Sequence, residues 1–157
     1  MQGIKIIAVG RLKEKYLIDA QGEYIKRLSR FCPVEIKEIG EQRLPPEPSA
    51  AEIAAALKKE AAEITAAVPA GYAVAALCIE GRGYDSEGFS KLITGEGQNR
   101  IAFIIGGSNG LDEELKRSAE YRISMSGMTF PHHLARIMLL EQIYRGYMID
   151  AGTKYHK

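Results

Sequence analysis

Cysteine, histidine and long hydrophobic runs are all scarce in this 157-residue sequence. The two cysteines, Cys32 and Cys78, lie far apart beside apolar runs, which indicates free core thiols in a cytoplasmic protein. Together with three histidines they show no metal-site spacing, so we expect no metal. No apolar run approaches the roughly 18 residues of a membrane span, and the N-terminus passes directly into a strand-like segment. We therefore expect neither a membrane span nor a signal peptide.

The known phosphate-binding motifs are also lacking. The glycine loop Gly106-Gly107-Ser108-Asn109-Gly110 has neither the Lys nor the Ser/Thr of a P-loop, and it is not G-x-G-x-x-G after a first strand. A nucleotide-hydrolysing protein is therefore disfavoured. The loop is either a tight turn or a backbone surface that a ligand can approach closely, since glycine has no side chain.

Hydrophobic periodicity predicts one α/β domain over residues 1–157. Apolar, partly β-branched runs predict five strands: Ile4–Val9, Val34–Ile39 near the sheet edge, Tyr72–Ile79 in the centre, Ile101–Ile105 and Tyr121–Met125. Helical spacing predicts helices over Tyr16–Arg30, from the N-cap Ser49 to Ala67, from Asp85 or Ser86 to about Ile93, over Leu111–Ala119, and from Pro131 to about Asp150. Gly81-Arg82-Gly83 is predicted as a turn. This alternation favours a mostly parallel sheet with helices on both faces.

The net charge of +1 conceals an uneven distribution. Lys5–Arg30 has seven basic and three acidic residues, Glu35–Glu63 has four and seven, and Arg122–Lys157 has five and two. If the two basic ends meet in the fold, they form a patch suited to a polyanion. The alternative is a solvated surface of mixed charge.

Two glycine turns follow the last two strands, and the rest of the chain is expected to support a site there. In the second turn, Ser126–Phe130, backbone N–H groups suit a flat polar group such as an adenine edge, with Met128 and Phe130 packing on its face. The alternative is a simple connection with two buried apolar anchors.

The last helix is apolar on nearly every side, which favours a homodimer interface over a monomer core. Glu141 and Arg145 are four residues apart and are predicted to pair. His132 and Arg136 share another face beside the predicted pocket, where they suit an anionic partner. The tail Thr153–Lys157 is either a frayed end or a substrate clamp, with an aromatic ring for stacking and cations for phosphate.

Four segments together resemble one known family. They are I-A-V-G-R-L-K-E-K-Y at 7–16, F-I-I-G-G-S-N-G-L at 103–111, S-M-S-G-M-T-F-P-H-H-L-A-R-I-M-L-L-E-Q-I-Y-R at 124–145 and the terminal Y-H at 155–156. The sequence is similar, over nearly its whole length, to the SPOUT-class ribosomal RNA large subunit methyltransferase H family. The resemblance implies a C-terminal trefoil knot, an obligate homodimer, and methyl transfer from S-adenosylmethionine to N3 of a pseudouridine of 23S rRNA in the assembled ribosome.

The resemblance also implies which residues form the site. S-adenosylmethionine is expected to contact Leu77, Gly106, Met125, Ser126, Gly127, Met128, Thr129 and Phe130. The N3 proton is expected to pass to His156 or His132, or the resulting anion to be stabilised by Arg136, Arg145 or Lys154. His156 and Tyr155 are expected to close over the base, within one protomer or across the dimer. A non-catalytic RNA- or ribosome-binding module on the same fold is the alternative.

Overall fold

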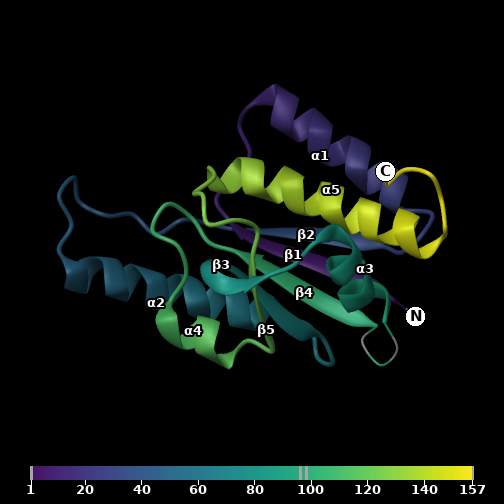
Figure 1. Ribbon diagram of the computed structural model, residues 1–157. Coiled ribbons are helices and arrows are strands. Elements are labelled where there is room, and N and C mark those ends of the chain that lie inside the picture. The colour runs from purple at the N-terminus through teal and green to yellow at the C-terminus, as the bar shows by residue number, and fades with distance from the viewer. Residues whose placement is uncertain (1, 96, 98, 157) are drawn as a thin grey trace.

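Strands and helices alternate along the described chain, residues 2–95, 97 and 99–156 of a computed structural model (Figure 1). In order, the elements are β1 (Gly3–Val9), α1 (Lys15–Leu28), β2 (Val34–Ile39), α2 (Ala50–Ala67), β3 (Ala73–Gly83), α3 (Ser86–Thr94), β4 (Arg100–Ile105), α4 (Glu113–Ser118), β5 (Tyr121–Ser124) and α5 (His132–Asp150). The sequence predicted each of them, with bounds that differ by a few residues.

The five strands form one sheet in the order β2-β1-β4-β3-β5, and every neighbouring pair is parallel. The prediction of an α/β fold with a parallel sheet is confirmed. β2 lies at an edge, as its alternating pattern indicates, and β4, which is buried at every position after Arg100, lies in the middle. Because the strands are parallel, the carboxyl ends of β1, β3, β4 and β5 open toward one edge of the sheet.

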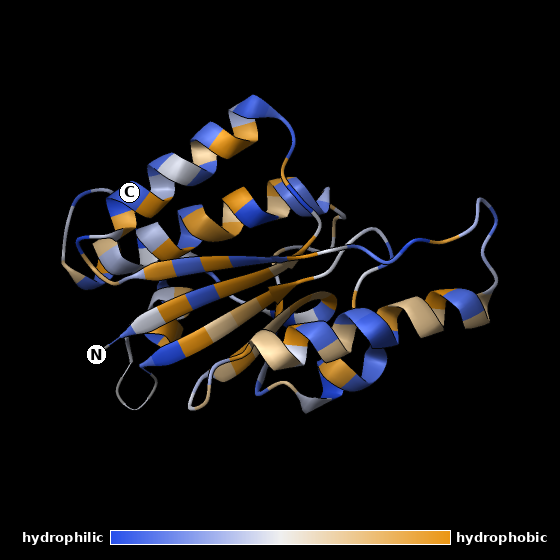
Figure 2. Ribbon diagram, turned by 180° about the vertical axis from the view of Figure 1, so that it is seen from behind, coloured by the Kyte–Doolittle hydropathy of each residue, from blue (hydrophilic) through white to orange (hydrophobic). Residues whose placement is uncertain are grey.

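Helices cover both faces of the sheet (Figure 1). Leu28 of α1, Phe89 of α3 and Leu140 of α5 belong to one hydrophobic core, and Ile64 of α2 and Leu115 of α4 belong to the core on the other face. Figure 2 shows long hydrophobic stretches on the central strands, whereas hydrophilic residues are frequent on α1 and α2. α5 lies on the sheet with α1 and α3 as its neighbours, so one side of this apolar helix is covered within the monomer.

The start of α2 has the predicted capping box. The Ser49 hydroxyl accepts a hydrogen bond from the Glu52 N–H at 3.1 Å, and the Glu52 carboxylate accepts one from the Ser49 N–H at 3.1 Å. These two bonds satisfy N–H groups that have no partner inside the helix.

The predicted turn at Gly81-Arg82-Gly83 is wrong, because these residues extend β3. Ile123 of β5 is paired with Leu77 and again with Arg82, so the chain between those two residues crosses β5. A Cβ on Gly81 would lie 2.7 Å from backbone atoms of Arg122 and Ile123. Gly81 is therefore required because two backbones approach closely here. In the sequence, a glycine needed for such an approach looks the same as a glycine needed for a turn.

Candidate functional site

The carboxyl ends of three neighbouring strands surround a cavity of about 270 Å³, which we call the strand-end pocket. β3 contributes Leu77, β4 ends in Ile105 and Gly106, and the loop after β5 closes the other side. Its lining is Leu77, Cys78, Ile79, Glu80, Ile105, Gly106, Gly110, Leu111, Lys116, Ile123, Met125, Ser126, Met128, Thr129, Phe130, His132 and Ala135.

Nearly all residues predicted to contact the cofactor line this one pocket. Leu77 and Gly106 do so, and so do Met125, Ser126, Met128, Thr129 and Phe130. Gly127 does not line it. His132, predicted for catalysis, lies at the same wall, directly after the N-cap of α5, Pro131.

The glycine loop after β4 is both a tight turn and a wall of the pocket. Gly107 and Gly110 form a bridge in which the Gly110 N–H donates to the Gly107 carbonyl at 3.1 Å, and Gly110 has a φ of 76°. A Cβ on Gly106 would meet the Gly110 carbonyl oxygen. The loop is held from outside by Glu41, whose carboxylate accepts the Ser108 N–H at 2.9 Å. The loop is therefore a tight turn that also forms one wall of the pocket, and contact with a ligand there stays a prediction.

The loop after β5 is held by serine hydroxyls. The Ser124 hydroxyl donates to the Ser126 carbonyl at 3.1 Å, and the Ser126 hydroxyl accepts the Met128 N–H at 3.0 Å. Met128 is 72% exposed, so it is not the buried anchor of a simple connection. Its thioether lies at the pocket wall, where it can cover a ligand.

The strand-end pocket offers a ligand no unpaired positive charge from a lysine or arginine among the described residues that line it. Among the described residues that line it, Lys116 is the only Lys or Arg, and its ammonium pairs with Glu80 and, at 2.8 Å, with Glu113. Burial lowers the pKa of Lys116, but the hydrogen bonds to the two carboxylates outweigh burial and raise it. Burial, followed by the neighbouring His133, lowers the pKa of His132, although Glu41 opposes both. His132 is therefore a neutral imidazole near pH 7.

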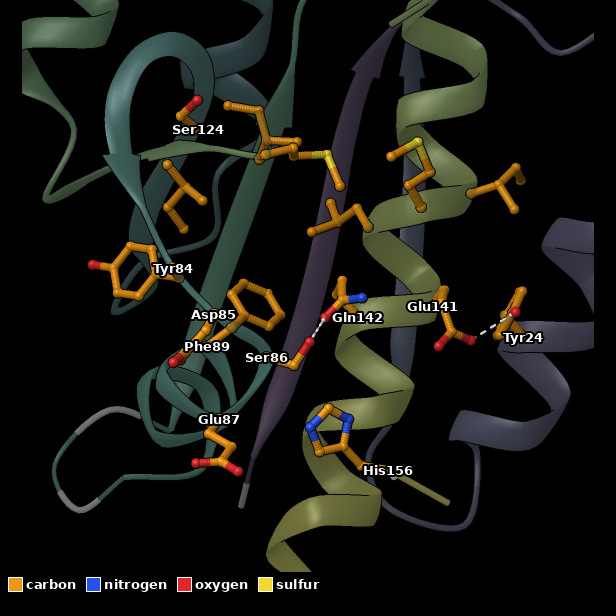
Figure 3. A pocket seen from close by; sticks show the side chains of 16 residues that line it. Tyr24, Tyr84, Asp85, Ser86, Glu87, Phe89, Ser124, Glu141, Gln142 and His156 are labelled. Atoms are coloured by element: carbon orange, nitrogen blue, oxygen red, sulfur yellow. Dashed lines mark hydrogen bonds between the residues drawn. The ribbon is translucent and has the colours of Figure 1, made fainter. Parts of the chain in front are cut away.

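A larger cavity of about 810 Å³, the α3–α5 groove, adjoins the strand-end pocket and shares Leu77, Ile123 and Met125 with it. α3 and α5 form its two sides (Figure 3). The Ser86 hydroxyl of α3 donates to the Gln142 side chain of α5 at 2.8 Å. His156 of the C-terminal tail lies at the rim of this groove.

The tail is docked on α5 by a cluster around Glu141. One carboxylate oxygen of Glu141, Oε2, accepts the Tyr155 hydroxyl at 3.0 Å and the Tyr24 hydroxyl of α1 at 2.7 Å. The other oxygen accepts Arg145, as the four-residue spacing predicted. Arg145 also lies 3.2 Å from the imidazole of His156 and over the ring of Tyr155. Tyr155, Arg145 and His156 thus lie together, and the tail is not frayed through residue 156.

Arg136 has a structural position that conflicts with its predicted role on a substrate. Its side chain is 1% exposed and bonds Glu38 at 2.7 Å, Gln21 at 3.1 Å and the Gly10 carbonyl at 3.1 Å. Burial would raise the pKa of Glu38, but hydrogen bonds from Arg136 and the Leu12 N–H lower it. The four-residue spacing from His132 placed both residues on one face of the helix, but it carried no information about the distant groups that hold Arg136.

The sequence argument missed several residues of the site. Cys78, Ile79 and Glu80 directly follow Leu77 and could have been found from their place near the end of that strand, whereas nothing in the sequence pointed to Lys116 of α4. Tyr24 reaches Glu141 across 117 positions, and its helical spacing indicated only a buried face. Burial, followed by the hydrogen bond to Glu141, raises the pKa of Tyr24 to about 12, so its hydroxyl remains a donor.

Within the described residues, no group of three or more His, Cys, Asp or Glu side chains is arranged to hold a metal ion. No helix in that part of the chain is long and apolar enough to cross a membrane.

Comparisons with known proteins give a consistent result. Residues 1–156 match the family described as "Predicted SPOUT methyltransferase". Two relatives named "Ribosomal RNA large subunit methyltransferase H", from Streptococcus pyogenes serotype M5 (strain Manfredo) and serotype M12 (strain MGAS2096), are each 46% identical over 98% of this chain and 99% of their own. A solved structure, "a probable methylase family protein from Haemophilus influenzae Rd KW20", has a TM-score of 0.56 at 11% identity, covering 98% of this chain and 70% of the other, and thus shares the fold. With the parallel sheet and the strand-end pocket, the match along the whole sequence establishes that this chain belongs to the SPOUT methyltransferase family.

Proposed function

We propose that this protein transfers a methyl group from S-adenosylmethionine to N3 of a pseudouridine in 23S rRNA of the assembled ribosome. The observation that carries the proposal is the strand-end pocket, because it gathers the residues that the family resemblance implies for the cofactor. The 46% identity to relatives named as large-subunit rRNA methyltransferases supports the same activity.

The lining of the pocket fits S-adenosylmethionine better than a nucleotide phosphate. Leu77, Ile105 and Leu111 offer apolar walls, and the loops at Gly106 and Ser126–Phe130 offer backbone polar groups for an adenine edge. The paired Lys116 leaves no strong cation for a phosphate. Bound there, S-adenosylmethionine would supply a methyl group that its sulfonium has already activated.

The chain's own residues then position the target base and handle one proton. The pocket and the adjoining groove must hold the N3 atom in line at about 3 Å from the methyl carbon, and such positioning supplies much of the rate. The N3 proton must leave, and its acceptor is solvent water or, for a base held in the strand-end pocket, His132, which is neutral near pH 7. Arg145 and Tyr155 are held together by Glu141 beside the groove, and Arg145 contacts His156 at the groove's rim.

A knotted homodimer belongs to the same proposal. The crossing of β5 by the chain between Leu77 and Arg82 makes a loop of the kind that a trefoil knot needs. Leu134, Ile137 and Met138 of α5 remain partly exposed after the helix has packed on the sheet, and the last two line the α3–α5 groove. A second copy packing on these side chains would bury them and form a further wall of the groove without filling it.

The competing proposal is a non-catalytic RNA- or ribosome-binding module. Calorimetric titration separates the two, because the enzyme binds one S-adenosylmethionine per protomer and the module binds none. A charged Leu77→Arg substitution in the pocket should abolish that heat, whereas the exposed control Lys58→Ala on α2 should keep it.

The direct test is methyl transfer from tritiated donor to 70S particles, separated subunits and free rRNA, followed by mapping of the modified base. We expect label on a pseudouridine of 23S rRNA in 70S particles. If the native chain binds S-adenosylmethionine but, like Leu77→Arg, leaves every substrate unlabelled, the rRNA assignment is wrong.

A further inference from the structure

One ring nitrogen of His156 is already engaged before any substrate binds. Nη1 of Arg145 lies 3.2 Å from Nδ1 of His156. A guanidinium is always protonated and can only donate hydrogen bonds. Nδ1 must therefore accept, which requires a lone pair there. In this geometry the proton of a neutral His156 imidazole is on Nε2.

The Arg145 guanidinium is held in place by Glu141 and Tyr155, so that its Nη1 points to His156. Its Nε donates to Oε1 of Glu141 at 2.9 Å, its Nη2 forms an ion pair with the same oxygen at 2.8 Å, and its guanidinium lies 4.8 Å from the centroid of the Tyr155 ring. Glu141 is itself fixed through Oε2, which accepts the hydroxyls of Tyr155 and Tyr24. Of the three guanidinium nitrogens, Nη1 is the one left for His156.

We infer that His156 serves the reaction as a hydrogen-bond donor through Nε2–H and not as the base, and that Glu141 and Arg145 are positioning residues that set this tautomer. The inference rests on the proposed function, because it concerns the base that would enter the groove where His156 lies. It narrows the two roles that the sequence left open for His156 to one.

The proton balance is consistent with a donor. The bond from the methyl carbon to sulfur breaks, its electron pair stays on sulfur, and a bond from that carbon to N3 forms. The N3 proton leaves to solvent water, because within one protomer His132 at the start of α5 lies about 20 Å along the helix axis from Arg145, too far to reach the same base as His156. As N3–H is lost, negative charge develops on the two carbonyl oxygens beside N3. A donor on such an oxygen stabilises the charge, as donors do in an oxyanion hole.

The tautomer can be measured without substrate. Long-range proton–nitrogen correlation spectra of the full chain, with ¹⁵N-labelled histidine, distinguish protonated from bare ring nitrogens, and the chain has only three histidines to assign. At neutral pH we expect His156 to have a bare Nδ1 and a protonated Nε2. In Arg145→Gln and Glu141→Ala this signature should give way to a mixture of tautomers. A protonated Nδ1 in the unmodified chain overturns the inference, whether or not the protein methylates RNA.

Activity gives a second, independent test with a matched pair of variants. The side-chain amide of Gln can donate from near the position of Nε2, whereas that of Asn lies near Nδ1. We expect His156→Gln to stay within about tenfold of the native single-turnover rate and His156→Asn to fall on the order of a hundredfold, the loss typical of one missing donor. Equal, severe losses in both variants would identify His156 as the base and overturn the inference.

Discussion

At the scale of single residues, the ion pair between buried Arg136 and partly exposed Glu38 shows how a charge near a site can act on the fold. Arg136 is the largest fully buried side chain of the described residues, and its bonds join the start of α5 to the end of β2, to α1 and to the Gly10 carbonyl after β1. These contacts hold His132, four positions earlier, against the pocket. Its contribution to activity is therefore expected to be indirect, through the position of α5.

Removing one partner of that pair should be costly. Glu38→Ala removes the carboxylate partner of the buried Arg136 guanidinium, and because that carboxylate is 37% exposed we expect the free energy of unfolding in denaturant to fall by about 1–3 kcal/mol. The control Glu35→Ala, on the same strand, breaks a pair in which the carboxylate is 70% exposed, and should cost less than about 1 kcal/mol. Similar losses in the two variants would contradict a special role for Arg136.

The stability that the Arg136–Glu38 pair contributes should also depend on pH, which the same unfolding experiment can measure. The pKa of Glu38 is lower when the protein is folded, so the stabilisation is complete above the unfolded value, about 4.3, and is lost as pH falls through the folded value. The difference in unfolding free energy between the native chain and Glu38→Gln should therefore shrink in acid.

At the scale of elements, the crossing of β3 over β5 depends on one glycine. A Cβ on Gly81 would lie 2.7 Å from backbone atoms of Arg122 and Ile123, which cannot move aside as a side chain can. We expect Gly81→Val to lower the unfolding free energy by about 1–3 kcal/mol or to prevent folding. Gly83→Val is the control in the same strand, since a Cβ there meets nothing within 4 Å. Equal stability of the two variants would mean that the crossing is not close.

The sequence predicts the helices and strands better than it predicts the contacts between them. Periodicity and the capping box at Ser49 located strands and helices, because these signals lie within a few residues of one another. The strand order and the crossing at Gly81 depend on contacts between distant segments. The family resemblance supplied most of the pocket residues, whereas the Tyr24–Glu141 contact had no local signal at all.

At the scale of the whole molecule, α5 has apolar residues for two sets of contacts. Leu139, Leu140 and Ile143 are buried in the monomer's own core. Leu134 is 42% exposed, and Ile137 and Met138 face the α3–α5 groove. The monomer core therefore accounts for only part of the apolar circumference that suggested a homodimer.

The remaining apolar side gives the last prediction. If a second copy packs on this side of α5, Met138→Lys places an unpaired charge in the interface, and light scattering should show the mass falling from twice 17.3 kDa toward that of one chain. Ala55→Lys, on the exposed side of α2, should leave the mass unchanged. Met138→Leu keeps the apolar contact and should also remain dimeric. A native chain that is already monomeric at micromolar concentration would contradict the dimer, because an obligate interface of this kind buries well over about 1,000 Å² and does not dissociate there.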